Sequence, residues 1–270
     1  LYYTSVLTEK IDSGISMRAH IVLAHPEPHS FNAKLAGISN RTLASAGYDI
    51  SFSDLCHNGF DAVEGSHHYN VRKDQQFFHT QTEQRYNAEK SALAPEVNAE
   101  INNIQSCDLL VVHFPLWWFG APAILKGWID RVFVYGKVYT STKRYDNGMC
   151  RGKKMVACVT TGASADSCAA NGKEGDTKMH LWPLLFPPRY IGFDVAEPLT
   201  LHGIGGVAFI EGDAKADAIA QTSASRWADY IKHINDAPLI RYNKNSDFDE
   251  TGRLGPDAKS FSPLIRHEKK

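Results

Sequence analysis

Three consecutive aromatic residues, Trp117, Trp118 and Phe119, lie near the middle of this 270-residue chain. They follow an apolar run at residues 109–114, which Pro115 interrupts. A short apolar run is typical of a buried strand, and parallel sheets bind ligands outside the carboxyl ends of their strands. Three large rings at such an end could therefore form a platform for a flat ligand. They could equally be a strand end packed into the core, and the sequence leaves both interpretations open.

The loop AHPEPHSFN at residues 24–32 is a second stretch that could bind a ligand. It leads into an expected helix, whose unpaired N-terminal amides attract an anion such as phosphate. A helix end contributes only about 0.3–1 kcal/mol per charge at exposed sites. Binding therefore also needs side chains, here His25, Ser30 and Asn32. In the alternative interpretation, Ser30 merely caps the helix and the histidines face solvent.

A third stretch, Thr160-Thr161-Gly162, ends another apolar run. Small residues with free backbone amides let a ligand approach the chain closely. Three strand ends would then carry a phosphate-type loop, an aromatic loop and a small-residue loop. This combination favours a phosphate-bearing flat cofactor, for which a flavin is the natural candidate.

Other catalytic patterns find little support. The loop at residues 24–32 contains neither G-x-G-x-x-G nor G-x-x-x-x-G-K-[ST], which disfavours a Rossmann NAD site or a P-loop. There is no G-x-S-x-G elbow, and Cys158 lies within an apolar run, where a thiol is usually inert. His67 and His68 lack H-E-x-x-H or a comparable ligand spacing, so surface histidines are expected rather than a metal site.

The composition is that of a soluble globular protein. With 29 basic and 30 acidic residues, no broad attraction to nucleic acid or to an anionic membrane is expected. The five cysteines form no CxxC pair, which disfavours a disulfide framework and fits the reducing cytoplasm. No apolar stretch approaches the roughly 20 residues that span a bilayer, so no membrane insertion is expected.

Hydrophobic periodicity predicts alternating strands and helices. Strands are expected at residues 18–24, 48–55, 109–114, 153–164 and 189–195, and helices at residues 30–47, 95–107, 122–133 and 213–236. On the third helix, Lys126, Asp130 and Arg131 are expected to face solvent. Residues 56–94 show no sustained period and are interpreted as a long loop, which either packs on the surface or covers a site.

The alternation predicts one α/β domain at residues 17–236, with a doubly wound five-stranded parallel sheet and helices on both faces. Residues 1–16 lack the features of a secretory signal and are interpreted as a leader outside the fold. Residues 237–270 are rich in charge, proline and glycine. They are expected to form an extension packed on the same domain or on a dimer partner.

Several segments between about residue 18 and residue 198 resemble the NAD(P)H:quinone oxidoreductases of the flavodoxin-like superfamily. They are LAHPEPHSFNAKL, FPLWWFGAPAILKGWIDRVF, VYT, YDNG, the KK-to-TTG strand, and LWPLL followed by GFDVAEP. The resemblance implies a flavodoxin-like fold and a cytoplasmic homodimer with FAD at each subunit interface, FMN being the alternative. It also implies ping-pong hydride transfer from NAD(P)H through flavin N5 to a quinone-type acceptor.

The resemblance also assigns site residues position by position. The cofactor phosphates would be held by His25, Ser30, Phe31 and Asn32. The flavin ring would lie against Pro115, Leu116, Trp117, Trp118 and Phe119. Its other edge would contact Thr160, Thr161, Gly162 and Ala163. The substrate pocket would be lined by Trp118, Phe119, Ser141, Cys168 and Tyr139, the last reaching in from the second subunit.

One departure from the family pattern concerns the charge on the reduced flavin. Relatives of the animal type stabilise this charge with a Tyr and a His, whose positions here are occupied by Cys168 and Glu174. A carboxylate there would oppose the charge unless it were protonated. We expect backbone amides or Lys173 to provide the stabilisation instead. The candidate catalytic residues are therefore Gly162, Ala163, Lys173, Glu174 and Tyr139.

A second departure concerns the mouth of the pocket. The family's second covering tyrosine corresponds to Ser141, which predicts a wider or more polar opening. Three alternative functions remain open at this stage. They are an FMN-dependent azo- or nitroreductase, a flavoprotein ancillary subunit of a glutathione-gated potassium efflux transporter, and a flavodoxin-like electron carrier.

Overall fold

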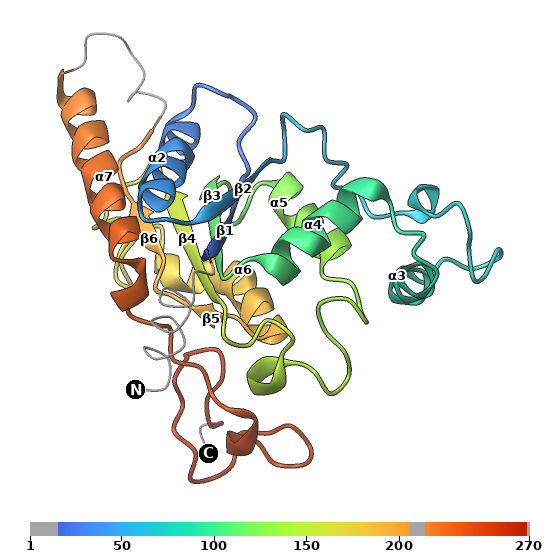
Figure 1. Ribbon diagram of the computed structural model, residues 1–270. Coiled ribbons are helices and arrows are strands. Elements are labelled where there is room, and N and C mark those ends of the chain that lie inside the picture. Colours follow the sequence, from blue (N-terminus) through green and yellow to red (C-terminus); the bar gives the residue numbers. More distant parts are fainter. Residues whose placement is uncertain (1–15, 206–213, 269–270) are drawn as a thin grey trace.

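A parallel β-sheet forms the centre of the protein (Figure 1). The computed structural model describes residues 16–205 and 214–268. The strands are β1 (Arg18–Leu23), β2 (Asp49–Asp54), β3 (Leu109–Pro115), β4 (Lys154–Thr160), β5 (Asp194–Val195) and β6 (Leu199–Leu201). They follow the order β2-β1-β3-β4-β5, and β6 also pairs with β4. All these pairs are parallel, which confirms the predicted doubly wound α/β class and adds a sixth strand to it.

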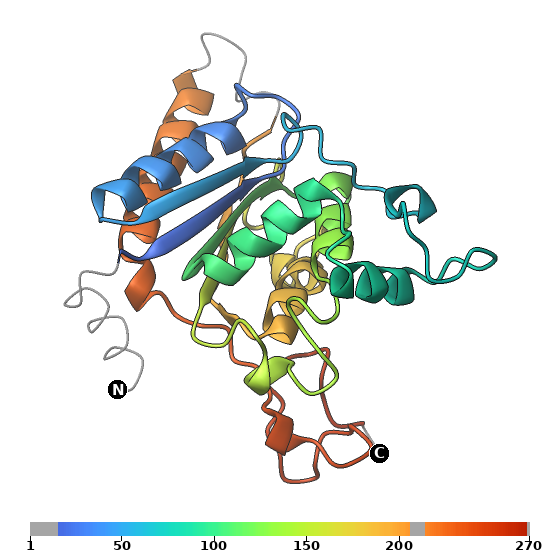
Figure 2. The same cartoon turned by 45° about the vertical axis from the view of Figure 1, so that its right-hand side comes forward.

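Helices cover both faces of the sheet. The α-helices are α2 (Phe31–Ser45), α3 (Thr80–Glu89), α4 (Pro95–Ser106), α5 (Ala123–Val132), α6 (Thr177–Ile191) and α7 (Ala214–Lys232). Short 3-10 turns are η1 (Ser66–His68), η2 (Tyr145–Asn147), η4 (Ile234–Asp236) and η5 (Asn245–Asp247). Helices α2 and α7 lie on one face, and α4, α5 and α6 lie on the other (Figures 1 and 2). Helix α3 stands away from the sheet, at the right of Figure 1.

The central strand β3 shows why the sheet needs two helix layers. Every residue of β3 is buried. Leu109 and Val111 face the layer of α2 and α7, whereas Leu110 and Val112 face the opposite layer. Successive side chains of a strand point to opposite faces, so a strand covered on both sides requires a continuous apolar run. No helix in the described parts of the chain is long and apolar enough to cross a membrane.

Local sequence signals set several helix ends as predicted. At the start of α2, the N–H of Ala33 donates to Ser30 Oγ at 3.1 Å. Gly47 follows the end of this helix with φ at +86°, a conformation that glycine adopts without steric cost. Pro95 occupies the first turn of α4, where its missing N–H leaves no helical hydrogen bond unmade.

The second half of the domain departs from the prediction. Helix α6 and strand β6 have no counterpart in the predicted elements, and residues 189–191 belong to α6. The strand predicted at residues 189–195 is therefore wrong at its start and covers only Asp194–Val195. Helix α6 contains three prolines, which remove helical hydrogen bonds and conceal the helix in the sequence. Its buried leucines pack into the core and stabilise the helix despite this cost.

Helix α3 lies within residues 56–94, where the prediction of a long loop is wrong for this part. Its buried residues include Glu83, Gln84 and Asn87, all of which are polar. The Glu83 carboxylate accepts hydrogen bonds from the N–H groups of Lys73 at 2.8 Å and Asp74 at 3.1 Å. A search for apolar periodicity cannot detect a helix whose inner face is polar.

Helix α5 corrects one prediction about solvent exposure. Lys126 and Asp130 face outward as expected and form an ion pair. Arg131, also predicted to face solvent, is only 3% exposed. Its guanidinium donates to the carbonyl oxygen of Asp61 at 2.6 Å and to Glu96 at 3.1 Å. A buried arginine needs such partners, and the carbonyl comes from a segment that sequence periodicity does not place.

The C-terminal segment, residues 237–268, runs below the sheet in Figure 1. The N–H of Ile240 donates to Val195 O at 2.8 Å, and the N–H of Asn245 donates to Asp146 at 2.6 Å. This segment thus contacts the α/β domain of its own chain, whereas the division at residue 236 stays a prediction. Residues 1–15 of the predicted leader lie outside the described residues.

A buried carboxylate joins four elements of the fold. Glu100 on α4 accepts hydrogen bonds from Ser53 Oγ on β2 at 2.5 Å and from Trp128 Nε1 on α5 at 2.7 Å. Its other neighbour is His20 Nε2 on β1, at 3.2 Å. Burial alone would raise the pKa of Glu100, but the partners, His20 foremost, outweigh burial and lower it. The folded state therefore favours the ionised carboxylate.

We predict that Glu100→Gln lowers the free energy of unfolding at neutral pH by about 2–3 kcal/mol, because charged hydrogen bonds are lost. The pKa of Glu100 is lowered on folding, so its contribution is present above the unfolded-state value of about 4.3 and is lost in acid. Urea denaturation from neutral pH to about pH 3.5 should show the two proteins converging. Glu89→Gln, at an exposed carboxylate, is the control. A difference that stays constant down to acid pH contradicts the assignment.

Candidate functional site

The aromatic stretch leaves β3 as a tight turn. Trp117 and Gly120 exchange two backbone hydrogen bonds, of 2.9 and 3.0 Å. Between them, Trp118 and Phe119 have positive φ angles of 49° and 61°. Positive φ at both central positions is typical of a type I′ turn, which normally takes Asn-Gly. Bulky residues in this conformation cost about 1–3 kcal/mol each, and such strain concentrates at functional sites.

The three rings of this turn lie at the surface. Trp117 is 44% exposed, Trp118 95% and Phe119 51%. The interpretation as a strand end packed into the core is therefore wrong for these rings. Exposed apolar side chains of this size, gathered on one turn, indicate a surface that binds another molecule.

The loop after β1 lies beside this turn. The ring of His25 packs edge-on against Trp117, with their centroids 5.7 Å apart. Asn32, at the start of α2, donates from Nδ2 to Thr160 Oγ1 at 2.9 Å and so reaches the end of β4. Its amide oxygen is buried and has no partner within the described residues. Leaving such a group unpaired costs about 1–3 kcal/mol, a cost that a ligand hydroxyl would remove.

The loop after β4 completes the edge. Two of its carbonyl groups accept hydrogen bonds from the segment after β6: Thr161 O from the N–H of Ile204 at 2.8 Å and Ala163 O from the N–H of Gly203 at 2.9 Å. Within the described residues, the N–H groups of Gly162 and Ala163 make no hydrogen bond. These two free donors can bind an electron-rich edge of a ligand, as the small residues predicted.

Sequence reasoning missed His180. Its ring packs edge-on against Phe119 at a centroid distance of 5.0 Å, so an imidazole adjoins the exposed aromatic turn. His180 lies in the first turn of α6, the helix absent from the prediction. Asp176 caps this helix by accepting from the N–H of Lys178 at 2.9 Å. That aspartate is the sequence signal that could have located the helix and its histidine.

Cys168, Lys173 and Glu174, which are expected near the charge on a reduced flavin, differ in their surroundings. Cys168 is buried, with Sγ 4.0 Å from Thr161 Oγ1. Lys173 extends into solvent with 82% of its side chain exposed and approaches Glu174 only at 3.8 Å.

The contacts of Tyr139 and Ser141 are with residues outside the aromatic turn of their own chain. The ring of Tyr139 packs against Tyr135 at 5.5 Å and Tyr190 at 5.4 Å, and its hydroxyl accepts from Gln81. Ser141 lines a cavity of about 800 Å³ between its loop and the C-terminal segment. Four arginines and four aromatic residues share this cavity, which suits an anionic ligand with a flat ring: Arg144, Arg189, Arg253, Arg266, Tyr145, Phe186, Tyr242 and Phe248.

The sheet order, together with an aromatic turn flanked by two loops at its carboxyl edge, defines a flavodoxin-like α/β protein. A family model described as "Flavodoxin-like fold" matches residues 17–230. NAD(P)H dehydrogenase [quinone] 1 of Cavia porcellus is 34% identical over 240 residues, which cover 88% of this chain and 84% of that protein. The protein of the same name from Rattus norvegicus is 36% identical over 190 residues, covering 70% and 69%.

A solved structure agrees with these sequence relatives. A protein of Klebsiella pneumoniae described as a candidate quinone reductase superimposes with a TM-score of 0.79 and 25% identity, covering 90% of this chain and 95% of that one. The chain therefore belongs to the flavodoxin-like family and, within it, to the NAD(P)H dehydrogenases [quinone]. The resemblance drawn from the sequence motifs is confirmed.

We predict that Trp118→Gly raises the free energy of unfolding of the ligand-free protein by about 1 kcal/mol. Glycine relieves the strain at positive φ, and little packing is lost from a ring that is 95% exposed. The same change should weaken binding of a flat ligand, as titration would show. Phe52→Gly is the matched control, because Phe52 is a 41% exposed aromatic on strand β2. If both variants are destabilised equally, the turn is not strained.

Proposed function

We propose that this chain reduces quinones with electrons from NAD(P)H and that it does so with a bound flavin. The observation that carries the proposal is the exposed, strained turn of Trp117, Trp118 and Phe119 between two loops with unpaired polar groups. The names of the two mammalian relatives support the substrate classes. When bound, a flavin would supply the hydride-transfer chemistry at N5 that the side chains of the protein lack.

The residues present fit a flavin. The N-terminus of α2, with Ser30, Phe31 and Asn32, and the nearby His25 would hold the phosphates, and the unpaired oxygen of Asn32 would accept from a hydroxyl. The ring would lie against the turn formed by Pro115, Leu116, Trp117, Trp118 and Phe119. FAD is proposed over FMN because the resemblance of the sequence motifs to the NAD(P)H:quinone oxidoreductases implies FAD.

The chain's own groups would stabilise negative charge on the ring. The free N–H groups of Gly162 and Ala163 would donate to its electron-rich edge, which Thr160 and Thr161 would also contact. They are fixed before reaction, because the carbonyl groups of Thr161 and Ala163 in the same loop already accept hydrogen bonds from the segment after β6. His180, beside Phe119, is a further group that could donate a proton or a hydrogen bond.

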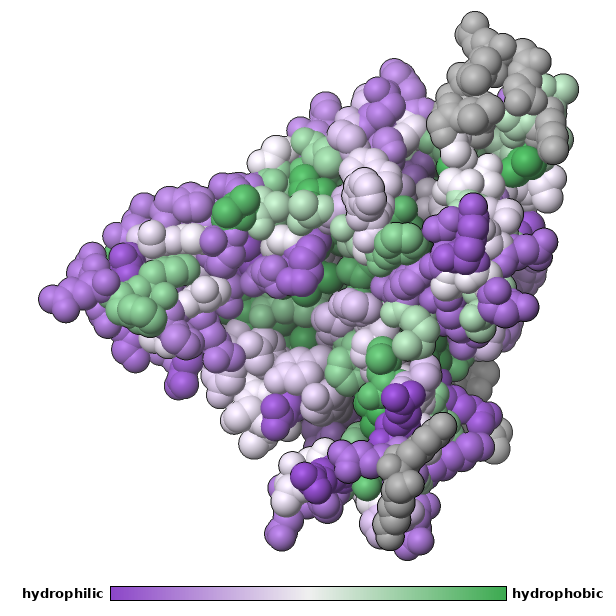
Figure 3. Space-filling model, turned by 180° about the vertical axis from the view of Figure 1, so that it is seen from behind, coloured by the Kyte–Doolittle hydropathy of each residue, from purple (hydrophilic) through white to green (hydrophobic). Residues whose placement is uncertain are grey.

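A second copy of the chain would close the site. Trp118 is 95% exposed, and the described partners of Tyr139 lie outside the aromatic turn. A homodimer would bring Tyr139 and Ser141 of one subunit over the turn of the other. Figure 3 shows apolar side chains gathered in the hollow middle of one face, framed by polar lobes, as an interface requires. Trp118 and Phe119 would then line a pocket that is shielded from water.

The test of function is direct. The purified protein should release FAD on denaturation and should oxidise NADH or NADPH rapidly when quinones are supplied. Released FMN together with a preference for azo or nitro acceptors would replace this proposal with that of an azo- or nitroreductase. Bound flavin without turnover would contradict the enzymatic role and favour the ancillary subunit or the electron carrier.

We predict that Ala163→Pro slows reduction of the bound flavin by NAD(P)H about 100-fold while flavin binding persists, because one preorganised donor is removed. Lys173→Ala should change this rate little, since the side chain is 82% exposed. Stopped-flow absorbance measures both rates. Ala165→Pro, two residues further along the loop, controls for the effect of proline itself. If Lys173→Ala slowed flavin reduction as much as Ala163→Pro does, the stabilisation of charge could not be assigned to the amides alone and would include Lys173.

A further inference from the structure

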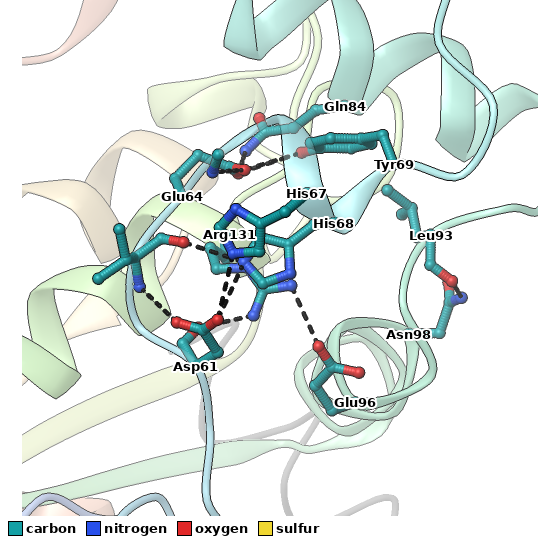
Figure 4. A network of polar contacts seen from close by, with 12 residues as sticks. Asp61, Glu64, His67, His68, Tyr69, Gln84, Leu93, Glu96, Asn98 and Arg131 are labelled. Carbon is teal, nitrogen blue, oxygen red and sulfur yellow. Dashed lines mark hydrogen bonds and ion pairs between the residues drawn. The ribbon is translucent and has the colours of Figure 1, made fainter.

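Three metal-ligating side chains converge in the segment between β2 and α3. Asp61 Oδ2 lies 3.3 Å from His67 Nε2 and 3.5 Å from His68 Nε2. The three side chains each offer a ligand atom, and these atoms all lie within 4.8 Å of one another. Figure 4 shows both imidazoles turned toward the same carboxylate. None of these residues belongs to the proposed flavin site.

Local packing holds the two histidines together. The two residues are neighbours in the chain on η1, and their ring centroids lie 3.9 Å apart. A Cβ at Gly65 would lie 2.7 Å from His67 Nδ1, so only glycine leaves room for this ring position. His68 Nε2 donates to Val63 O at 2.9 Å, a bond that metal binding would replace. The side chain of His68 is 11% exposed and that of His67 is 58% exposed, which leaves one side open to solvent.

The charges around the cluster favour a cation. The N–H of Val63 donates to Asp61 Oδ1 at 3.0 Å, which holds the carboxylate with its Oδ2 facing the two imidazoles. Glu64 and Glu96 add two carboxylates to the same network (Figure 4). Arg131 is the cation of this network, and its guanidinium binds Glu96 and the Asp61 carbonyl. The Asp61 carboxylate is therefore left for the imidazoles and for an ion between them.

We propose that Asp61, His67 and His68 bind one divalent transition-metal ion, with Zn²⁺ as the best match. Two imidazoles and a carboxylate suit Zn²⁺, Co²⁺ or Ni²⁺, whereas Mg²⁺ and Ca²⁺ prefer all-oxygen sites. Water would complete the coordination on the open side. The ion would fasten residues 61–68 to one another and, through Arg131, to helix α5.

Isothermal titration calorimetry of the full chain with its flavin, after dialysis against a chelator, tests the site. The expected result is one Zn²⁺ per chain with micromolar affinity and no heat from Mg²⁺. His67→Ala and His68→Ala should each weaken binding at least about tenfold. His57→Ala, at an exposed histidine of the same segment, and Cys56→Ser, at a half-exposed thiol, should bind as the wild type does.

Gly65→Ala supplies a second test that keeps all three ligands. The added methyl group would displace the His67 ring and should weaken Zn²⁺ binding without removing a ligand. Co²⁺ gives an independent readout, since its visible absorption bands should appear in the wild type and be lost in His67→Ala. Absence of Zn²⁺ binding, or binding unchanged in both histidine variants at wild-type flavin content, would overturn the proposal.

Discussion

The buried carboxylate of Glu100 is the interaction on which both candidate sites depend. It joins β1, β2, α4 and α5 through hydrogen bonds to His20, Ser53 and Trp128. Helix α5 begins three residues after the aromatic turn closes at Gly120, so fixing this helix fixes one end of the turn. A buried charge is tolerable only with such partners, and losing one would leave the carboxylate only partly compensated.

The same helix also holds the segment that carries the histidine pair. A Cβ at Gly127 would lie 2.0 Å from Ala62 O, so α5 and this segment touch backbone to backbone. Arg131, one turn further along, binds the neighbouring carbonyl of Asp61. Helix α5 thus positions the aromatic turn at its start and the metal-ligating segment along its side. A rigid element between two sites gives each the fixed geometry that binding requires.

The sequence was sufficient for the features that follow a local rule. Apolar runs located β1, β3 and β4, alternation located β2, and Ser30, Gly47 and Pro95 located helix ends, because these signals act within a few residues. That the three candidate loops would meet at the carboxyl ends of the strands was expected from topology. Helix α3 and the burial of Arg131 were not predicted, because buried polar groups depend on partners that are distant in sequence. Helix α6 was not predicted, because its packing outweighs the three prolines it contains. His180 was not identified as a site residue, because it lies on this unpredicted helix.

Two other features were not predicted, the aromatic turn and the histidine cluster. In each, contacts with the rest of the fold hold a local conformation that the usual sequence rules disfavour. A type I′ turn would be predicted from Asn-Gly, whereas here it carries Trp118 and Phe119 at positive φ. Metal sites are recognised from regular ligand spacing, whereas adjacent His67 and His68 converge on Asp61 only because Gly65 gives one ring room. Such exceptions cost stability and persist where the surrounding structure supports them. Their occurrence at the exposed aromatic rings and at the convergent imidazoles is therefore an argument for function that is independent of any relative.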